Sequence, residues 1–286
     1  MAIFARRGKK MKLLFLDIDG TLFGTDGKIL PSSIRAMKQA QEKGVTIILA
    51  SGRDYTSLPW DQLNELDIPY VITCNGSAAY KTDTKECLYK ECLDKEEMVS
   101  VFNYILERGI HLNVQMNGGN YTEKKCQDYI KNMAVPDYVK EIIRNNCKAL
   151  DDITGFIREN DVDILKVTLN FQMKDDGEYL NREETGRYLK QFPDIQVVDG
   201  GFANLEFNKA GISKATGVRF LSEYLGVSVN DVIAIGDSEN DIEMLKIAGT
   251  GIAMGNAVEE AKAAADDITA SNDEDGVVKA IEKYLL

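Results

Sequence analysis

The segment KLLFLDIDGT, residues 12–21, decides the fold. Its first half is a short apolar run, and a turn-forming Asp-Gly-Thr follows directly, which is typical of a buried parallel strand and the loop after it. Two carboxylates, Asp17 and Asp19, flank a single residue at the end of this strand, and Gly20 lets the backbone turn sharply beside them. The segment therefore predicts a sheet whose loops carry acidic side chains.

More apolar runs of the same kind follow along the chain. Two of them, at 45–50 and 70–74, are separated from the first and from each other by helical segments. Pro31 opens the first of these helices and Gly44 ends it. Late in the chain another buried run, at 232–235, lies between helical patterns. Strands that alternate with helices in this way predict an α/β fold with a parallel sheet.

A more polar stretch separates the two halves of this pattern. Within it, residues 163–171 alternate, which predicts a strand with one apolar and one polar face. The apolar face has Leu165, Val167, Leu169 and Phe171, and the polar face has Ile164, Lys166, Thr168 and Asn170. We expect residues 11–82 and 193–286 to form a core domain, and residues 83–192 to form an inserted α+β domain with one solvated or cleft-facing sheet surface.

Charge and cysteine content narrow the class of protein. The 286 residues include 46 acidic and 34 basic side chains, a net charge of -12, and no basic stripe beyond a short one near the N-terminus. Binding to nucleic acid or to an anionic membrane surface is therefore disfavoured. Five cysteines without a CxxC pair, in a chain without a secretory segment, predict a reducing, cytoplasmic location. We expect residues 1–10 to be a short extension in front of the fold.

Three polar clusters, at 17–21, 51–53 and 236–241, each follow a predicted strand. The carboxyl ends of parallel strands face one crevice, so residues over 200 positions apart are expected to meet there. Asp237 and Asp241 then join the two aspartates of the first cluster, and such carboxylates repel one another unless a cation is present. Oxygen ligands favour a hard divalent ion, and Mg²⁺ is the best match.

Mg²⁺ held by few protein ligands usually binds phosphate oxygens as well. Arg53, Lys214 and the backbone of the Ser51-Gly52 turn are the available phosphate donors, and Lys214 stands at the start of a predicted helix, where the helix dipole also favours an anion. One carboxylate can then attack phosphorus while a second transfers a proton. Each motif alone is common and weakly informative, but all three clusters follow strands, which favours phosphoryl transfer.

The motifs together resemble a known family. DIDGT, SGR, the lone lysine in GISKATG, and GDSENDIEML are similar to the four successive motifs of the haloacid dehalogenase-like superfamily, in its Cof-like hydrolase branch. The resemblance covers residues 11–286 and includes Asn75-Gly76 after the third strand. It implies a Rossmann-like core with an α/β cap inserted between the second and third motifs. One departure is Ala215, where the branch usually has glycine.

The resemblance also implies roles for individual residues. Asp17 would be the nucleophile and Asp19 the general acid/base, with Lys214 completing the catalytic set. The implied Mg²⁺ ligands are the Asp17 carboxylate, the Asp19 backbone carbonyl and the Asp237 carboxylate, with Asp241 supporting through water or from behind. The implied phosphoryl contacts are Ser51, Lys214 and Asn240, with Gly52 and Arg53 beside them.

Our leading hypothesis is a Mg²⁺-dependent phosphatase that hydrolyses a small phosphorylated metabolite, such as a sugar phosphate, nucleotide or cofactor phosphate, through an aspartyl-phosphate. One alternative is a phosphomutase of the phosphomannomutase type, which shares the DxDGT opening. Another is a non-catalytic sensor of phosphometabolites. A sensor would be expected to lack Asp17, Asp19 or Lys214, and all three are present. The motifs specify neither a particular substrate nor an oligomeric state.

Overall fold

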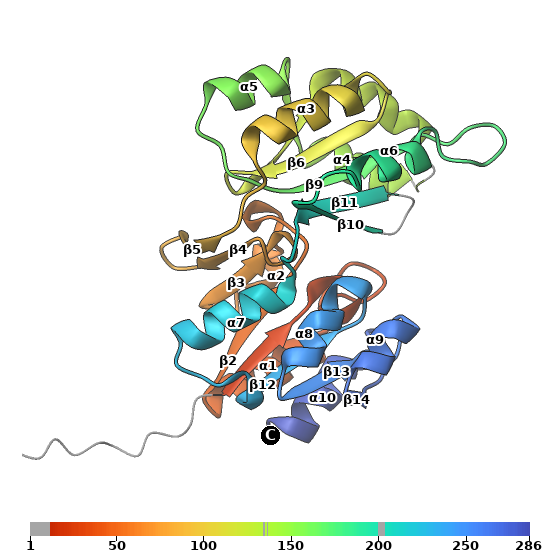
Figure 1. The fold of residues 1–286 in the computed structure, drawn as a ribbon. Coiled ribbons are helices and arrows are strands. Elements are labelled where there is room, and N and C mark those ends of the chain that lie inside the picture. The colour runs from red at the N-terminus through yellow and green to blue at the C-terminus, as the bar shows by residue number, and fades with distance from the viewer. Residues whose placement is uncertain (1–11, 134, 136, 200–203) are drawn as a thin grey trace, which may run out of the picture. The chain divides into compact units, whose positions relative to one another are not determined.

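The computed structural model describes residues 12–133, 135, 137–199 and 204–286, so the expected extension at 1–10 lies outside the described residues. The chain divides into two compact units (Figure 1). The first unit consists of Met1–Gly52, Pro59–Tyr89 and Ser213–Leu286, and the second of Arg53–Leu58 and Lys90–Ile212. Each unit is built on its own sheet.

The first unit contains an eight-stranded sheet in the order β14-β13-β12-β1-β2-β3-β4-β5. Its strands are β1 Lys12–Leu16, β2 Val45–Ala50, β3 Tyr70–Thr73, β4 Ala78–Lys81, β5 Glu86–Lys90, β12 Val232–Gly236, β13 Thr250–Ala253 and β14 Asp267–Ile268. Strands β1, β2, β3, β12, β13 and β14 pair in parallel, whereas β4 runs antiparallel to β3. The predicted α/β class with a parallel sheet is confirmed, and the antiparallel edge is an addition to it.

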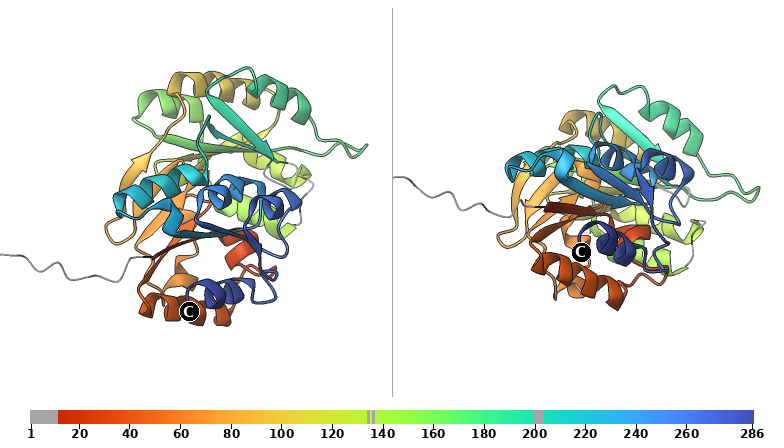
Figure 2. Two further views of the ribbon diagram at one scale, coloured as in Figure 1. Left: turned by 60° about the horizontal axis from the view of Figure 1, so that its bottom comes forward. Right: turned by 90° about the horizontal axis from the view of Figure 1, so that it is seen from below.

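Helices cover both faces of this sheet. They are α1 Pro31–Glu42, α2 Trp60–Leu63, α7 Lys214–Tyr224, α8 Ile242–Ile247, α9 Glu259–Ala264 and α10 Gly276–Tyr284. Figure 2 shows α1 and α10 together on one face, with α7 and α8 on the other. Because both faces are covered, residues 13–16 of β1 are fully buried whichever way their side chains point. The central strands are therefore rigid supports for the loops at their ends.

The second unit contains a six-stranded sheet in the order β10-β11-β9-β6-β7-β8. Its strands are β6 His111–Met116, β7 Gly119–Glu123, β8 Lys148–Leu150, β9 Ile164–Asn170, β10 Ile195–Asp199 and β11 Asn204–Lys209. Its helices are α3 Lys95–Leu106, α4 Asp137–Asn145, α5 Ile153–Glu159 and α6 Arg182–Leu189, with a 3₁₀ segment at Lys124–Asn132. The pairs β6–β7, β6–β9, β9–β11 and β10–β11 are antiparallel, which lets the two faces of the sheet differ in polarity.

The faces of this second sheet do differ. Val167 and Leu169 of β9 pack into a core with side chains of α3, α5 and α6, while Lys166 and Thr168 lie on the opposite, polar face. Ile164 was expected on that polar face, and this expectation was wrong, since Ile164 belongs to the apolar core. The register between β6 and β9 shifts at Gln115/Met116, and this bulge turns the first residue of β9 to the other side.

The extent of the second unit differs from the expected range of 83–192. It begins at Lys90 and continues to Ile212, because β10 and β11 pair with β9 and so complete its sheet. It also includes the short segment 53–58, where the Asp54 carboxylate accepts a hydrogen bond from the Asn120 amide. Among the described residues, no helix is long and apolar enough to span a membrane.

Candidate active site

Four loops of the first unit meet because the strands before them are neighbours. Strands β12, β1, β2 and β3 are adjacent and parallel, and Leu16 of β1 pairs with Ile235 of β12 and Leu49 of β2. The loops at 17–22, 51–52 and 236–241 therefore leave the same edge of the sheet, and so does the turn after β3. Backbone or side-chain groups of all four loops contact a neighbouring loop there.

The loop after β1 is shaped around two acidic side chains. Asp17 is buried, with its backbone N–H 3.0 Å from the Ile235 carbonyl oxygen, whereas the Asp19 side chain is exposed. Gly20 has a φ of 84°, and a Cβ there would lie 2.2 Å from Asp237 Oδ2. Only glycine fits both the left-handed backbone and this close approach. Thr21 then donates its hydroxyl proton to Asp237 Oδ1 at 2.8 Å.

Lys214 is the cation at the centre of the site. It begins α7, its side chain is 1% exposed, and its Nζ lies 2.5 Å from Asp17 Oδ1 and 2.7 Å from Asp241 Oδ1. Burial alone would lower the pKa of Lys214, but the two carboxylates outweigh burial and hold that pKa above its ordinary value. The lysine is therefore charged, and it lies between two buried carboxyl groups.

The acidic side chains outnumber this lysine. Asp17, Asp237 and Asp241 each offer a carboxylate oxygen within 4.8 Å of the others. Burial, and then repulsion from Asp241, raise the pKa of Asp17 well above its usual range and raise that of Asp237 to about 6. Asp17 Oδ2 is buried and has no hydrogen-bond partner among the described residues. Clustered carboxylate oxygens with one left unpartnered fit a hard divalent cation such as Mg²⁺.

Asp241 also shapes the loop after β12. Its Oδ2 accepts hydrogen bonds from the backbone N–H groups of Asp237 at 3.0 Å and Ser238 at 3.1 Å, while its Oδ1 accepts from Lys214. A Cβ on Gly236 would lie 2.4 Å from Asp241 Cγ, so glycine is needed where the carboxylate folds back over the strand end. Both oxygens of Asp241 are thus engaged by the protein, which suits a supporting role behind the cation.

The expected phosphate contacts come together only in part. Ser51 is buried, and its carbonyl accepts the backbone N–H of Asn75 at 3.1 Å. Asn240 Nδ2 donates to Asn75 Oδ1, also at 3.1 Å, so these residues lie in one cluster. Arg53, by contrast, belongs to the second unit, where its Nη1 donates to the Ser57 carbonyl at 2.9 Å. Gly52 is the last residue of its first-unit segment.

Two further features bear on the motifs. The departure at Ala215 leaves the start of α7 in place, because a Ser213–Thr216 capping box closes the first turn and Ala215 is buried behind Lys214. The sequence assigned no role to Asn75, Gly76 or Thr21, although all three contribute contacts or close packing to this cluster of loops. A signal was present for the first two, since a turn-forming Asn-Gly directly follows a buried strand.

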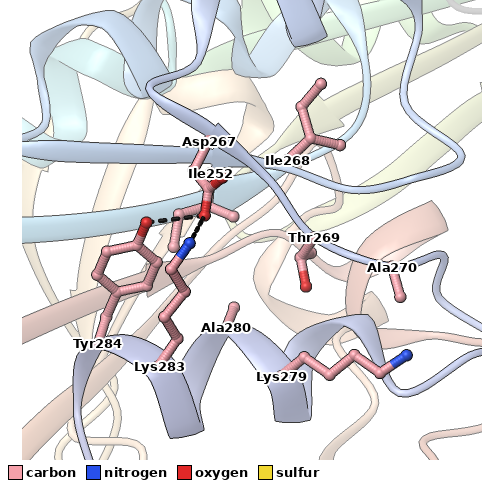
Figure 3. A pocket seen from close by; sticks show the side chains of 9 residues that line it. All are labelled: Ile252, Asp267, Ile268, Thr269, Ala270, Lys279, Ala280, Lys283 and Tyr284. Atoms are coloured by element: carbon pink, nitrogen blue, oxygen red, sulfur yellow. Dashed lines mark hydrogen bonds and ion pairs between the residues drawn. The ribbon is translucent and has the colours of Figure 1, made fainter.

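A separate pocket of about 210 Å³ lies between β14 and α10 of the first unit (Figure 3). Three of its polar side chains contact one another, because Lys283 Nζ and the Tyr284 hydroxyl both lie 2.7 Å from Asp267 Oδ2. Figure 3 shows Lys279 extending away from this carboxylate. None of the motif residues lines the pocket, so the strand-end cluster remains the candidate active site.

An α/β core whose strand-end loops gather carboxylates around a buried lysine is the arrangement expected of haloacid dehalogenase-like hydrolases. The chain belongs to this family, since the family's sequence profile matches residues 14–281. The resemblance drawn from the four motifs is therefore confirmed. The expectation of an enzyme of the phosphoric monoester hydrolase class is confirmed as well, because the relatives described next are named as phosphatases.

Relatives resemble the chain over almost its whole length. The 5-amino-6-(5-phospho-D-ribitylamino)uracil phosphatase YcsE of Bacillus subtilis is 30% identical over 98% of each chain. The pyridoxal phosphate phosphatase YbhA of Escherichia coli is 26% identical over 96% of this chain and 99% of its own. A solved haloacid dehalogenase-like hydrolase from Bacteroides thetaiotaomicron superposes with a TM-score of 0.79 at 30% identity, covering 96% of this chain and 99% of that one. Named members of the family thus act on phosphorylated small molecules.

Proposed function

We propose that this chain is a Mg²⁺-dependent phosphatase that hydrolyses a small phosphorylated metabolite through an aspartyl-phosphate on Asp17. The observation that carries the proposal is the buried Lys214 ammonium, which bonds Asp17 Oδ1 while Asp17 Oδ2 has no partner among the described residues. A carboxylate held at one oxygen, with the other oxygen unpartnered, suits attack on phosphorus. Structural ion pairs seldom leave a buried carboxylate oxygen unsatisfied.

The cluster of acidic side chains supports Mg²⁺ as the cation. Asp17 and Asp237 would hold it with their carboxylates and Asp19 with its backbone carbonyl, while Asp241 would act from behind because both of its oxygens are engaged. When bound, the cation would offset the negative charges of the site and of the phosphate, which otherwise repel each other. Lys214 supplies the same kind of compensation permanently.

The first half of the reaction transfers the phosphoryl group to the protein. An Asp17 carboxylate oxygen forms a bond to phosphorus as the bond between phosphorus and the ester oxygen breaks. Asp19 gives its proton to the departing oxygen, which leaves as an alcohol. The exposed position of Asp19 suits this role, since a leaving group or a water molecule can reach its carboxyl group. Ser51, Asn240 and the backbone around Gly52 would donate hydrogen bonds to the phosphoryl oxygens.

The second half returns the protein to its starting state. Asp19, now a carboxylate, accepts a proton from a water molecule as that water's oxygen bonds to phosphorus. The acyl-phosphate bond breaks, inorganic phosphate departs, and Asp17 is again a carboxylate. Lys214 is charged in the free enzyme, because its two carboxylate neighbours keep its pKa high. It therefore balances charge on Asp17 and on the phosphoryl group without donating a proton.

The range of substrates that we propose is sugar phosphates, nucleotides and cofactor phosphates, which includes the kinds of compound named for the relatives. We further propose that the second unit, Arg53–Leu58 and Lys90–Ile212, is the cap domain expected from sequence and selects among them, because the first unit holds the catalytic residues without it. A cytoplasmic location is supported by five cysteines that are all free thiols. Arg53, which the sequence also singles out as a phosphate donor, would contribute a cationic side chain to substrate binding.

The test is release of inorganic phosphate from a panel of these compounds in the presence of Mg²⁺. We expect release from some members, none in excess EDTA, full recovery on adding Mg²⁺, and no replacement by Ca²⁺, which takes more ligands in looser geometry. Asp19→Asn should lower kcat by about 10² to 10⁴. Phosphate that moves between hydroxyls without release would identify a phosphomutase, and full activity in chelator would overturn the metal assignment.

A further inference from the structure

The turn after β3 has an unusual backbone. Cys74, Asn75 and Gly76 are consecutive residues with positive φ values of 53°, 55° and 97°. The left-handed region is unfavourable for residues with a Cβ, and Asn tolerates it better than most. Among the described residues, the other non-glycine residues with positive φ occur singly. Strained backbone of this kind persists where surrounding contacts hold it, often at functional sites.

Contacts to three other loops hold this turn. The Asn75 backbone N–H donates to the Ser51 carbonyl, and the Asn75 side-chain oxygen accepts from Asn240 Nδ2. Gly76 lies against the start of α7, where a Cβ would come 1.9 Å from the Ser213 carbonyl oxygen and 2.9 Å from the Lys214 nitrogen. One buried turn thus touches the loop after β2, the loop after β12, and the segment that carries the catalytic lysine.

The contact with Asn240 decides which end of that amide is a donor. Asn240 Oδ1 accepts the Ser238 hydroxyl proton at 2.8 Å, and Asn240 Nδ2 donates one hydrogen to Asn75 Oδ1 at 3.1 Å. An amide nitrogen carries two hydrogens, so one is still available to a ligand. Flipping the amide would place its oxygen against Asn75 Oδ1, breaking that bond, and would turn the same oxygen toward the position of that hydrogen. An oxygen there would repel the oxygens of a phosphoryl group.

We infer that Asn75 is a positioning residue for phosphoryl transfer. Its side-chain oxygen fixes the donor orientation of the Asn240 amide, and its backbone N–H holds the Ser51 loop beside it. The inference rests on the proposed phosphatase function, because it assigns Asn240 a hydrogen bond to the transferring group. Asn75 is given this role through its bonds to Asn240 and to the Ser51 loop.

The decisive variant is Asn75→Gly, because glycine adopts the left-handed φ without strain and keeps the backbone N–H while losing the side-chain acceptor. With p-nitrophenyl phosphate and Mg²⁺, we expect kcat to fall about tenfold and KM to change much less, as one oriented hydrogen bond is lost in the transition state. Asn240→Ala should lower kcat similarly. The double variant should equal Asn240→Ala alone, since Asn75 has nothing left to orient.

Asn117→Gly is the matched control. Asn117 also has a positive φ, of 50°, and its side-chain oxygen also accepts a backbone N–H, that of Asp163, but it lies in the β6–β7 turn of the second unit. We expect this variant to keep kcat while losing a comparable amount of thermal stability. If the losses of kcat in Asn75→Gly and Asn240→Ala multiply in the double variant, the inference is overturned while the phosphatase function stands. The same holds if the kcat of Asn75→Gly equals that of the wild type.

A measurement independent of activity tests the orientation itself. In protein with ¹⁵N-labelled asparagine, the side-chain amide hydrogens of Asn240 should be inequivalent in exchange rate, with the one bonded to Asn75 protected from solvent. Asn75→Gly should remove this protection, and Asn117→Gly should leave it. If the Asn240 amide hydrogens exchange at the same rates in Asn75→Gly as in the wild type, the inference is contradicted. This result can be obtained even with a protein that releases no phosphate, so failure of the inference can be told apart from failure of the proposed function.

Discussion

The two units place their polar side chains in opposite ways. In the first unit, charged groups follow the ends of parallel strands, and Lys214 meets Asp17 and Asp241 there. In the second unit, polar groups lie in the middle of antiparallel strands, along one face of the sheet. Lys166 and Glu206 form an ion pair of 2.7 Å on that face, and neutral amides and hydroxyls surround it.

This difference in polar groups indicates what kind of ligand each unit is suited to bind. The first holds three clustered carboxylates against one lysine, an arrangement that fits a further cation. On the polar face of the second unit, the charges of Lys166 and Glu206 cancel each other. The face also presents neutral groups, including buried oxygens of Asn113 and Asn204 that have no partner among the described residues. Such groups accept hydrogen bonds from hydroxyl and amide groups. We therefore expect the first unit to carry the reaction and the second to influence which substrate reacts.

The largest effect should come from Asp17→Asn in the first unit. The substitution keeps the size of the side chain and leaves Lys214 paired with Asp241, so the fold should persist. It removes the nucleophile, and we expect kcat to fall by at least about 10⁴ on every substrate. Circular dichroism checks the fold and phosphate release checks the rate. A substrate that escaped this loss would show that the reaction is not confined to the first unit.

Lys214→Ala should come next. Removing the buried cation leaves Asp17 and Asp241 facing each other, so we expect kcat to fall by about 10² to 10³, more than KM rises. Repulsion should also lower the melting temperature in EDTA, and Mg²⁺ should restore part of it. Lys246→Ala, which removes an exposed lysine paired with Glu243, serves as the control with little effect. An effect on KM alone would make Lys214 a docking group.

Substitutions on the polar face of the second unit should change the selectivity between substrates more than the overall rate of hydrolysis. The double variant Lys166→Met/Glu206→Gln removes both charges of the pair. We expect this variant, and separately Asn170→Ala, to change the ratio of kcat/KM between two metabolites by about tenfold. Hydrolysis of p-nitrophenyl phosphate, which has no such groups to recognise, should stay within about twofold. Equal losses on every substrate would remove the distinction between the units.

The smallest effect concerns stability and the only histidine. His111 is buried on the second sheet, and burial lowers its pKa to about 4 from an ordinary 6.5. Below pH 6.5 His111 is protonated in the unfolded chain but stays neutral in the folded one, so His111 by itself should lower the free energy of unfolding by about 2 kcal/mol between pH 7 and pH 5. Urea titrations should show a shallower fall in His111→Gln. Equal slopes would place His111 in contact with water.

Several elements were predictable because their signals are local. The strands β1, β2, β3 and β12 each appear in the sequence as a short apolar run that ends in a turn. The start of α1 at Pro31 and the stop at Gly44, with its φ of 87°, are equally local. The edge hairpin β4–β5 and the bulge at Gln115/Met116 were not predicted, since both depend on pairing with other strands. For the same reason, the prediction that the inserted domain ends at residue 192 was wrong, because it excluded β10 and β11 from the sheet that they complete.

The residues of the loops that follow buried strands, including the aspartates and the serine-glycine turn, can be identified from the sequence, as can the lysine at the start of its helix. Only the tertiary structure decided that Lys214 Nζ lies between Asp17 and Asp241, and that Asn75 holds Asn240. The first of these contacts joins residues 197 positions apart. Strand and turn preferences act over a few residues, whereas such distances depend on the order in which strands pair, which packing of the whole unit determines.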